Sequence, residues 1–96
     1  MSEYFDLDVQ LHTACLSGNL DRAKELIDEG AYDVNQGLCG ACFGGHKEVA
    51  LLMVEYGANG FYEAYLEAKR GNNEELVKMM LTYGKENNRG FIMTWK

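Results

Sequence analysis

Three glycines in this chain, Gly30, Gly57 and Gly84, are spaced 27 residues apart, and each ends a similar run of residues. The three runs read DRAKELIDEG, EVALLMVEYG and ELVKMMLTYG. Self-similarity at a fixed period is typical of repeat proteins, in which each copy is one supersecondary unit. Each glycine lies where a helix would need a left-handed C-terminal cap, a conformation that glycine adopts without a Cβ penalty. We therefore expect an array of stacked helical units, with a glycine ending a helix in each copy.

The chain has 96 residues, which suffices for one small domain and is too short for two. Hydrophobic residues make up 47% of the sequence and the net charge is −6. We therefore expect a folded protein that binds neither nucleic acid nor an anionic membrane. No apolar run approaches the roughly 20 residues needed to cross a bilayer, and the first residues, MSEYFDLDVQ, lack the features of a secretory signal. Three cysteines in such a chain indicate reduced thiols and predict a cytoplasmic location.

Each copy has the pattern of two antiparallel helices joined by a short turn. We expect the first helices over residues 9–17, 36–43 and 62–70, and the second helices over residues 19–29, 46–56 and 73–83. Apolar residues recur at helical spacing in the second helices. A helix pair of this size cannot bury its apolar face alone, so the copies must stack. The predicted fold is an all-α solenoid of helix-turn-helix repeats.

The turns inside the copies contain glycine at slightly different positions. They are Ser17-Gly18, Gly44-Gly45 and Gly71. Because Gly71 lies one residue early relative to Gly45, we expect one inserted residue near Asn72-Asn73. Asn19 or Asn72 is placed to accept hydrogen bonds from the free amides that begin the second helix.

The residues within each copy resemble the ankyrin repeat. The first copy has L-H-x-A-C at residues 11–15, followed by Gly18-Asn19-Leu20-Asp21, Gly30-Ala31 and Asp33-Val34-Asn35. The second copy has Gly45-His46, Glu48-Val49 and Gly57-Ala58-Asn59, and the similarity covers about residues 9–84. The period of 27 residues is shorter than the roughly 33 residues of the ankyrin repeat. The missing residues are those of the β-hairpin finger between repeats, and the Thr-Pro that opens the first helix is absent from every copy.

This resemblance implies one domain over residues 1–96, with ankyrin-like repeats at about 9–35, 36–61 and 62–87 and a C-terminal half-repeat cap at 88–96. It implies a protein-protein interaction module without an active site or a cofactor. Such a module binds its partner protein through the concave face, which the first helices and the interrepeat loops form. The short-period copies are also similar to ankyrin-like repeats of large DNA viruses, which would make a host protein the partner.

The end of the chain carries a cluster of apolar residues on an incomplete unit, namely Phe91, Ile92, Met93 and Trp95. A terminal repeat must present a polar outer face to stay soluble. We therefore expect this tail to form a capping helix over the third repeat, and the chain to be a monomer. The alternative is a self-assembling structural protein in which the tail pairs with another chain.

The resemblance also selects candidate contact residues, because the two variable positions after the small-residue pair of each ankyrin repeat point to the concave face. Here these positions hold Leu16 and Ser17, Phe43 and Gly44, and Lys69 and Arg70. Leu16, Phe43 and Arg70 would form a column of two apolar anchors and one cation, of the kind that dominates interface energetics. The alternative is that Leu16 and Phe43 pack against a second helix or a terminal cap. The interrepeat loops add further residues that either contact a partner or cover the edge of the core: Tyr32, Asp33, Gln36, Phe61 and Tyr62.

Cys39 and Cys42 have the C-x-x-C spacing of redox and zinc sites. Cys39 lies near the start of a predicted helix, where the helix dipole lowers a thiol pKa, and Cys15 with His12 or His46 would complete a zinc site. However, Cys15 and Cys42 occupy one position of the repeat, where ankyrin repeats have a small buried alanine. A buried cysteine acts as a small apolar residue, so packing is the favoured interpretation, and a small zinc or redox protein is the alternative.

The two histidines are predicted to be structural. His12 matches the histidine of the ankyrin motif, whose hydrogen bonds brace neighbouring repeats, and His46 matches the histidine that begins the second helix. No G-x-S-x-G, phosphate loop or H-E-x-x-H motif is present. We therefore expect no enzyme.

Overall fold

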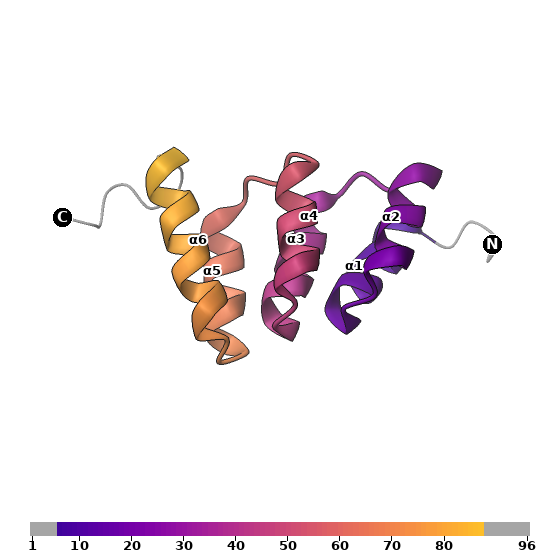
Figure 1. Cartoon of the computed structure of the whole chain (residues 1–96). Coiled ribbons are helices and arrows are strands. Elements are labelled where there is room, and N and C mark those ends of the chain that lie inside the picture. The colour runs from indigo at the N-terminus through magenta and orange to yellow at the C-terminus, as the bar shows by residue number, and fades with distance from the viewer. Residues whose placement is uncertain (1–5, 88–96) are drawn as a thin grey trace.

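The computed structural model describes residues 6–87, and this part of the chain forms six α-helices arranged as three antiparallel pairs (Figure 1). The pairs are α1 (Leu7–Ser17) with α2 (Leu20–Glu29), α3 (Val34–Gly44) with α4 (Lys47–Glu55), and α5 (Phe61–Arg70) with α6 (Glu74–Asn87). The pairs stand in a row, so the molecule is elongated, with extents of 48 × 22 × 21 Å. The predicted all-α solenoid of helix pairs is confirmed, and the expected tail cap at 88–96 lies outside the described residues.

The helices form two layers. In Figure 1 the second helices, α2, α4 and α6, lie in front of the first helices, α1, α3 and α5. The first helices pack extensively against one another, whereas α2 and α4 touch at only a few points. The second helices therefore spread apart relative to the first ones, and the concave side of the array lies on the first helices.

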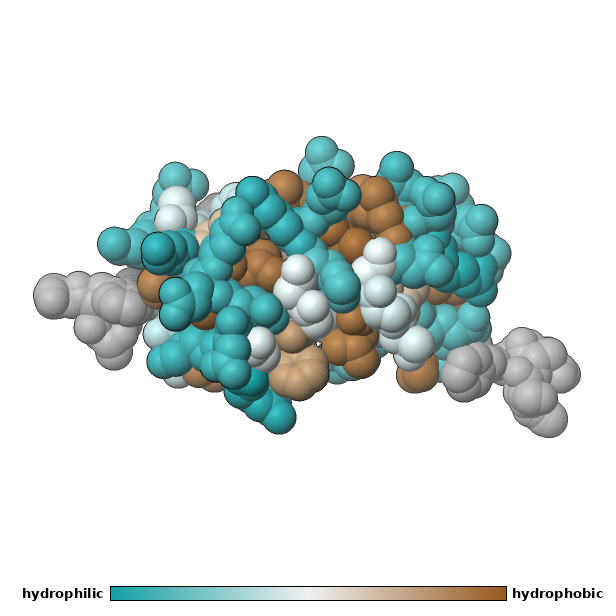
Figure 2. All heavy atoms as spheres, turned by 60° about the horizontal axis from the view of Figure 1, so that its bottom comes forward, coloured by the Kyte–Doolittle hydropathy of each residue, from teal (hydrophilic) through white to brown (hydrophobic). Residues whose placement is uncertain are grey.

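On the side formed by the turns and the second helices, hydrophilic side chains surround separate hydrophobic patches (Figure 2). None of the helices in residues 6–87 has the length and apolar character to cross a membrane.

The core repeats with the same period as the sequence. Three alanines 27 residues apart, Ala14, Ala41 and Ala68, are all buried, and so are Cys15 and Cys42. These small side chains let the first helices pack closely. Larger side chains at one position of the second helices fill the space between the two layers: Leu26, Met53 and Met80.

The turns within the pairs keep the 27-residue period without an insertion. The left-handed residue of each turn is Gly18 (φ 78°), Gly45 (φ 80°) or Asn72 (φ 60°). The expected insertion near Asn72-Asn73 is therefore wrong, because Asn72 stands at the position of Gly45, and Gly71 at the position of Gly44. Asparagine is one of the few residues other than glycine that enter the left-handed region at low cost.

The position before each left-handed residue contacts the backbone of the preceding pair. A Cβ atom on Gly44 would overlap the carbonyl oxygen of Leu16, and a Cβ atom on Gly71 would overlap the carbonyl oxygen of Phe43. The equivalent residue of the first pair is the exposed Ser17, which has no earlier helix pair beside it within residues 6–87. A glycine is thus required at this position wherever another pair precedes.

The left-handed glycines are covered by the residue immediately before the second helix of the next pair. The imidazole of His46 lies over Gly18, and the amide of Asn73 lies over Gly45. The Asn73 side-chain amide also donates hydrogen bonds to the carbonyl oxygens of Cys42 at 2.8 Å and Phe43 at 2.9 Å. The first and second turns are therefore each in contact with the next helix pair.

The helix caps agree with the sequence at two of the three periodic glycines. Gly30 (φ 121°) and Gly57 (φ 105°) follow α2 and α4 in a positive-φ conformation. Gly84 does not end a helix, because α6 continues to Asn87 and Gly84 is buried within it. The Asn19 side chain accepts a hydrogen bond from the Arg22 N–H at 3.1 Å, as expected. Asn72 instead forms the turn itself.

The close approach at Gly44 and Gly71 predicts that alanine at either position destabilises the fold. The new Cβ would meet a backbone oxygen, which cannot rotate away as a side chain can. We expect Gly44→Ala and Gly71→Ala each to lower the free energy of unfolding in urea by about 1–3 kcal/mol. Ser17→Ala is the matched control and should change it by less than about 0.5 kcal/mol. Equal stability of all three variants would contradict the backbone contact.

Candidate functional site

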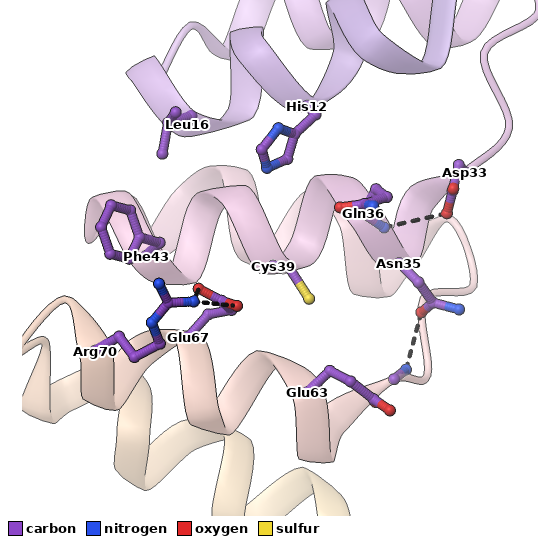
Figure 3. Close-up of a pocket in the computed structure, with 11 residues that line it drawn as sticks. His12, Leu16, Asp33, Asn35, Gln36, Cys39, Phe43, Glu63, Glu67 and Arg70 are labelled. Atoms are coloured by element: carbon purple, nitrogen blue, oxygen red, sulfur yellow. Dashed lines mark hydrogen bonds and ion pairs between the residues drawn. The ribbon is translucent and has the colours of Figure 1, made fainter.

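An open groove of about 770 Å³ runs across the concave side of the array (Figure 3). Its walls come from the three first helices and from the loops that precede α3 and α5. The groove is lined by His12 and Leu16 of α1, by Asp33, Asn35, Gln36, Cys39 and Phe43 of α3 and its N-cap, and by Gly60, Glu63, Glu67 and Arg70 of α5 and its N-cap. It is thus built where the resemblance placed the concave face.

One end of the groove is apolar and contains the predicted column. Leu16 and Phe43 are exposed to 37% and 42%. The Arg70 guanidinium carbon lies 5.8 Å from the centroid of the Phe43 ring, within the range of a cation–π contact. Arg70 also pairs with Glu67, with its Nη1 atom 3.2 and 3.1 Å from the two carboxylate oxygens. The structure therefore brings these residues together at the surface, where Leu16 and Phe43 leave apolar area open to solvent.

The other end of the groove is polar and lies at the N-termini of α3 and α5. Asp33 is the N-cap of α3, and its side chain accepts a hydrogen bond from the Gln36 N–H at 3.2 Å. Glu63 lies in the first turn of α5. In Figure 3 the His12 ring and the Cys39 sulfur lie between this end and the apolar one.

Two side chains at one repeat position hold the interrepeat loops, and the sequence interpretation missed them. The Asp8 carboxylate accepts hydrogen bonds from the backbone N–H groups of Tyr32 at 2.8 Å and Asp33 at 2.9 Å. One period later, the Asn35 side-chain oxygen accepts from Asn59 at 2.8 Å and Gly60 at 2.9 Å. The signal was available, because two hydrogen-bond acceptors lie 27 residues apart at Asp8 and Asn35. These bonds fix the loop backbone at the polar end of the groove.

The other predicted contact residues lie outside the groove. Tyr32 is 81% exposed on the loop that Asp8 holds. Tyr62 is 43% exposed and stacks on Tyr65, and the Lys69 ammonium lies 5.4 Å from the centroid of the same Tyr65 ring. Tyr62 and Lys69 thus lie on one face of α5. The equivalent face of α1 is the one that packs against α3.

Phe61 is a correction to the predicted contact residues. It is only 3% exposed, and its ring stacks on Tyr83 of α6 with the centroids 5.2 Å apart. Its side chain joins the two helices of the third pair. Phe61 is therefore part of the core, and no partner can reach it in this conformation.

The three cysteines are free thiols in an environment that opposes ionisation. Burial raises the pKa of Cys15 and of Cys42 to about 12, with smaller contributions at Cys42 from Cys39 and Glu67. The pKa of Cys39 is raised to about 11, chiefly by burial and then by the negative charges of Glu67, Glu63 and Asp33. A redox or zinc-binding cysteine needs the opposite shift, toward the thiolate. Within residues 6–87, no three potential ligand side chains are grouped closely enough for a metal ion.

His12 braces neighbouring helices by packing. An ideal Cβ atom on Gly40 would lie 2.9 Å from Cδ2 of the His12 ring, so the imidazole occupies the space that the glycine leaves. The hydrogen bonds implied for His12 are not formed by its ring in the described part of the chain. The glycine in the middle of α3 costs about 1 kcal/mol in helix propensity, and it leaves room for the His12 ring.

Residues 11–37 match the family model of the ankyrin repeat. Residues 11–37 therefore form an ankyrin repeat. The match covers α1 from residue 11 on, all of α2 and the first residues of α3, and the same helix pair recurs twice in the structure. No curated protein and no solved structure matches the chain significantly. Ankyrin repeats form solenoids with extended concave surfaces, and the groove of this chain lies on the concave side of its array.

The loop hydrogen bonds of the helical array predict that Asn35→Ala destabilises the second interrepeat loop. Loss of the side-chain oxygen leaves the Asn59 and Gly60 N–H groups without their acceptor. We expect the free energy of unfolding to fall by about 1–2 kcal/mol and the exchange of these two amide hydrogens to accelerate. Asn35→Asp retains an acceptor and should protect both amides. Unchanged exchange in Asn35→Ala would show that the oxygen does not hold the loop.

The raised thiol pKa values predict slow alkylation of the native protein. At a pH near 8, a thiol with a pKa of about 11 is ionised to roughly one part in a thousand, so labelling with iodoacetamide should be about 100-fold slower than in urea.

Because the folded-state pKa values of the three thiols lie above the unfolded ones, the folded protein retains protons that the unfolded chain releases. Stability should therefore decline as the pH rises from about 9 to 12. Rapid alkylation of a thiol in the native protein would contradict the raised pKa values on which both predictions rest.

Proposed function

We propose that this chain is a non-enzymatic interaction module that binds a partner protein in the groove formed by α1, α3 and α5. The observation that carries the proposal is the apolar end of the groove, where Leu16 and Phe43 expose apolar area beside the guanidinium of Arg70. Exposed aromatic and arginine side chains are the residue types that contribute most to binding energy at interfaces. Binding of a partner explains why a concave surface exposes aromatic and arginine side chains side by side.

The rigidity of the groove supports the same proposal. Its wall helices pack through buried alanines and cysteines, and its loops are held by backbone N–H groups that donate hydrogen bonds to Asp8 and Asn35. A preformed surface loses less conformational entropy when a partner binds than a mobile one does. Gln36 lines the groove, and Tyr32, Tyr62 and Lys69 are exposed beside it, which makes them secondary contacts.

The nature and location of the partner are a finer part of this proposal. The shortened repeats are similar to those of large DNA viruses, which supports a host protein as the partner. Three free thiols suit a reducing compartment, which supports binding in the cytoplasm. We propose a monomer as the binding unit.

The competing zinc or redox function receives no support from the described residues. Cys15 and Cys42 are fully buried in the core, and the acidic side chains around Cys39 favour its protonated form. The spacing of Cys39 and Cys42 is explained by packing, because Cys42 repeats the position of Cys15.

A double substitution at the apolar end tests the proposed function. We expect Phe43→Glu combined with Arg70→Glu to abolish the capture of partner proteins from a cell lysate that the wild-type chain retains, because it removes the aromatic anchor and reverses the cation. Each capture is compared by quantitative mass spectrometry, and the far-ultraviolet circular dichroism of each variant verifies folding.

The matched control is Tyr56→Glu combined with Lys24→Glu, which alters one aromatic and one cation outside the groove. Tyr56 is 47% exposed, close to the 42% of Phe43. This control should capture the same proteins as the wild type. If the groove variant retains the same partners, the groove is not the binding surface.

A further inference from the structure

The groove carries an uneven distribution of charge along its length. The one cation among the residues lining it, Arg70, lies at the apolar end, while Asp33 and Glu63 lie at the opposite end. Glu67 belongs to the same α5 wall and is paired with Arg70. The two ends of the groove therefore differ in electrostatic character as well as in hydrophobicity.

The carboxylates at the polar end have no cationic partner among residues 6–87. Asp33 accepts a hydrogen bond from a backbone N–H, which leaves its charge in place. Glu63 forms no ion pair with a described residue, whereas Glu67 does. The N-termini of α3 and α5 offset part of the negative charge, by about half a charge each. Three carboxylates line the groove, and one guanidinium and two helix N-termini offset only part of their charge, so the net charge of the groove is negative. His12 is the other side chain lining the groove that can carry a positive charge.

The negative charges of the three carboxylates affect the same side chain in the groove. Glu67, Glu63 and Asp33 all raise the pKa of Cys39, after the larger effect of burial. Cys39 lies in the middle of the groove floor, between the two ends (Figure 3). A cation that enters the groove near Cys39 would therefore meet the negative potential of all three side chains.

Helix geometry sets the distance between the two ends. Phe43 and Asp33 are ten residues apart along α3 and its N-cap, and Arg70 and Glu63 are seven residues apart on α5. Seven to ten residues of α-helix span about 10–15 Å. An extended chain covers this distance in about three to five residues.

We infer that the groove accepts an extended segment of the partner protein in which a large apolar residue and a lysine or arginine are about three to five positions apart. The apolar side chain packs on Leu16 and Phe43, and the cation lies between Asp33 and Glu63. This inference rests on the proposed function and adds the chemistry of the partner. Arg70 fixes the direction of the segment, because its guanidinium repels a second cation at the apolar end.

The test uses random linear peptides displayed on phage and selected against the full chain. We expect the selected peptides to contain an aromatic or aliphatic residue about three to five positions from lysine or arginine, and to bind more weakly as salt is added. Synthetic copies of these peptides are then titrated against wild type and variants. Glu63→Lys should weaken their binding by about tenfold, since it replaces an attraction with a repulsion.

Glu74→Lys is the matched control, because Glu74 is also an exposed glutamate in the first turn of its helix and lies outside the groove. Both substitutions remove a favourable charge from a helix N-terminus, so they perturb the fold alike. The control should bind the peptides within about twofold of the wild type.

The outcomes separate this inference from the function on which it rests. In one outcome, the selected peptides lose affinity for Phe43→Ser, carry no basic residue and bind Glu63→Lys normally. This outcome would overturn the charge assignment and leave the groove as the binding site. Selected peptides that bind Phe43→Ser as well as the wild type would overturn the proposed function itself.

Discussion

The backbone contact between consecutive first helices is the constraint on which this array depends. Gly44 rests on the carbonyl oxygen of Leu16, and Gly71 rests on that of Phe43. Backbone atoms cannot change rotamer to make room, so this contact sets how near one helix pair lies to the next. The buried alanines and cysteines of the first helices match that spacing. Larger side chains there would separate the helices, and the groove would lose the shared wall that places Phe43 beside Arg70.

The 27-residue period was enough to predict the helix pairs and the all-α solenoid, because stacking repeats must bury equivalent faces. It was not enough to assign each glycine a role. Aligning Gly71 with Gly45 suggested an insertion, since the two were compared by residue type. The structure shows two adjacent positions with different requirements, one for close backbone approach and one for positive φ. Asn72 meets the second requirement without being glycine, which sequence identity alone conceals.

The candidate site was predictable to the extent that a repeat position determines the direction of a side chain. Leu16, Phe43 and Arg70 come together because they share one position on parallel helices. Phe61 was mistaken for a contact residue because its burial depends on Tyr83, a residue of the next helix that the local pattern does not reveal. The loop hydrogen bonds were missed for a related reason. Their donors are backbone groups, which carry no signature in the sequence, so only the repeated acceptors at Asp8 and Asn35 could have indicated them.

The third helix pair shows where the chemistry of stacking changes. Cys15 and Cys42 are buried where the next first helix packs, but the same position of α5 holds Lys69. A further pair stacked in the same way would bury an ammonium group, which costs several kcal/mol unless a carboxylate accompanies it. Tyr62 stands where Asn35 accepts two loop N–H groups, and a tyrosine ring cannot reproduce that pair of bonds. The face of α5 therefore differs from the faces through which α1 and α3 receive the next helix pair, and Tyr62 and Lys69 are exposed next to the groove.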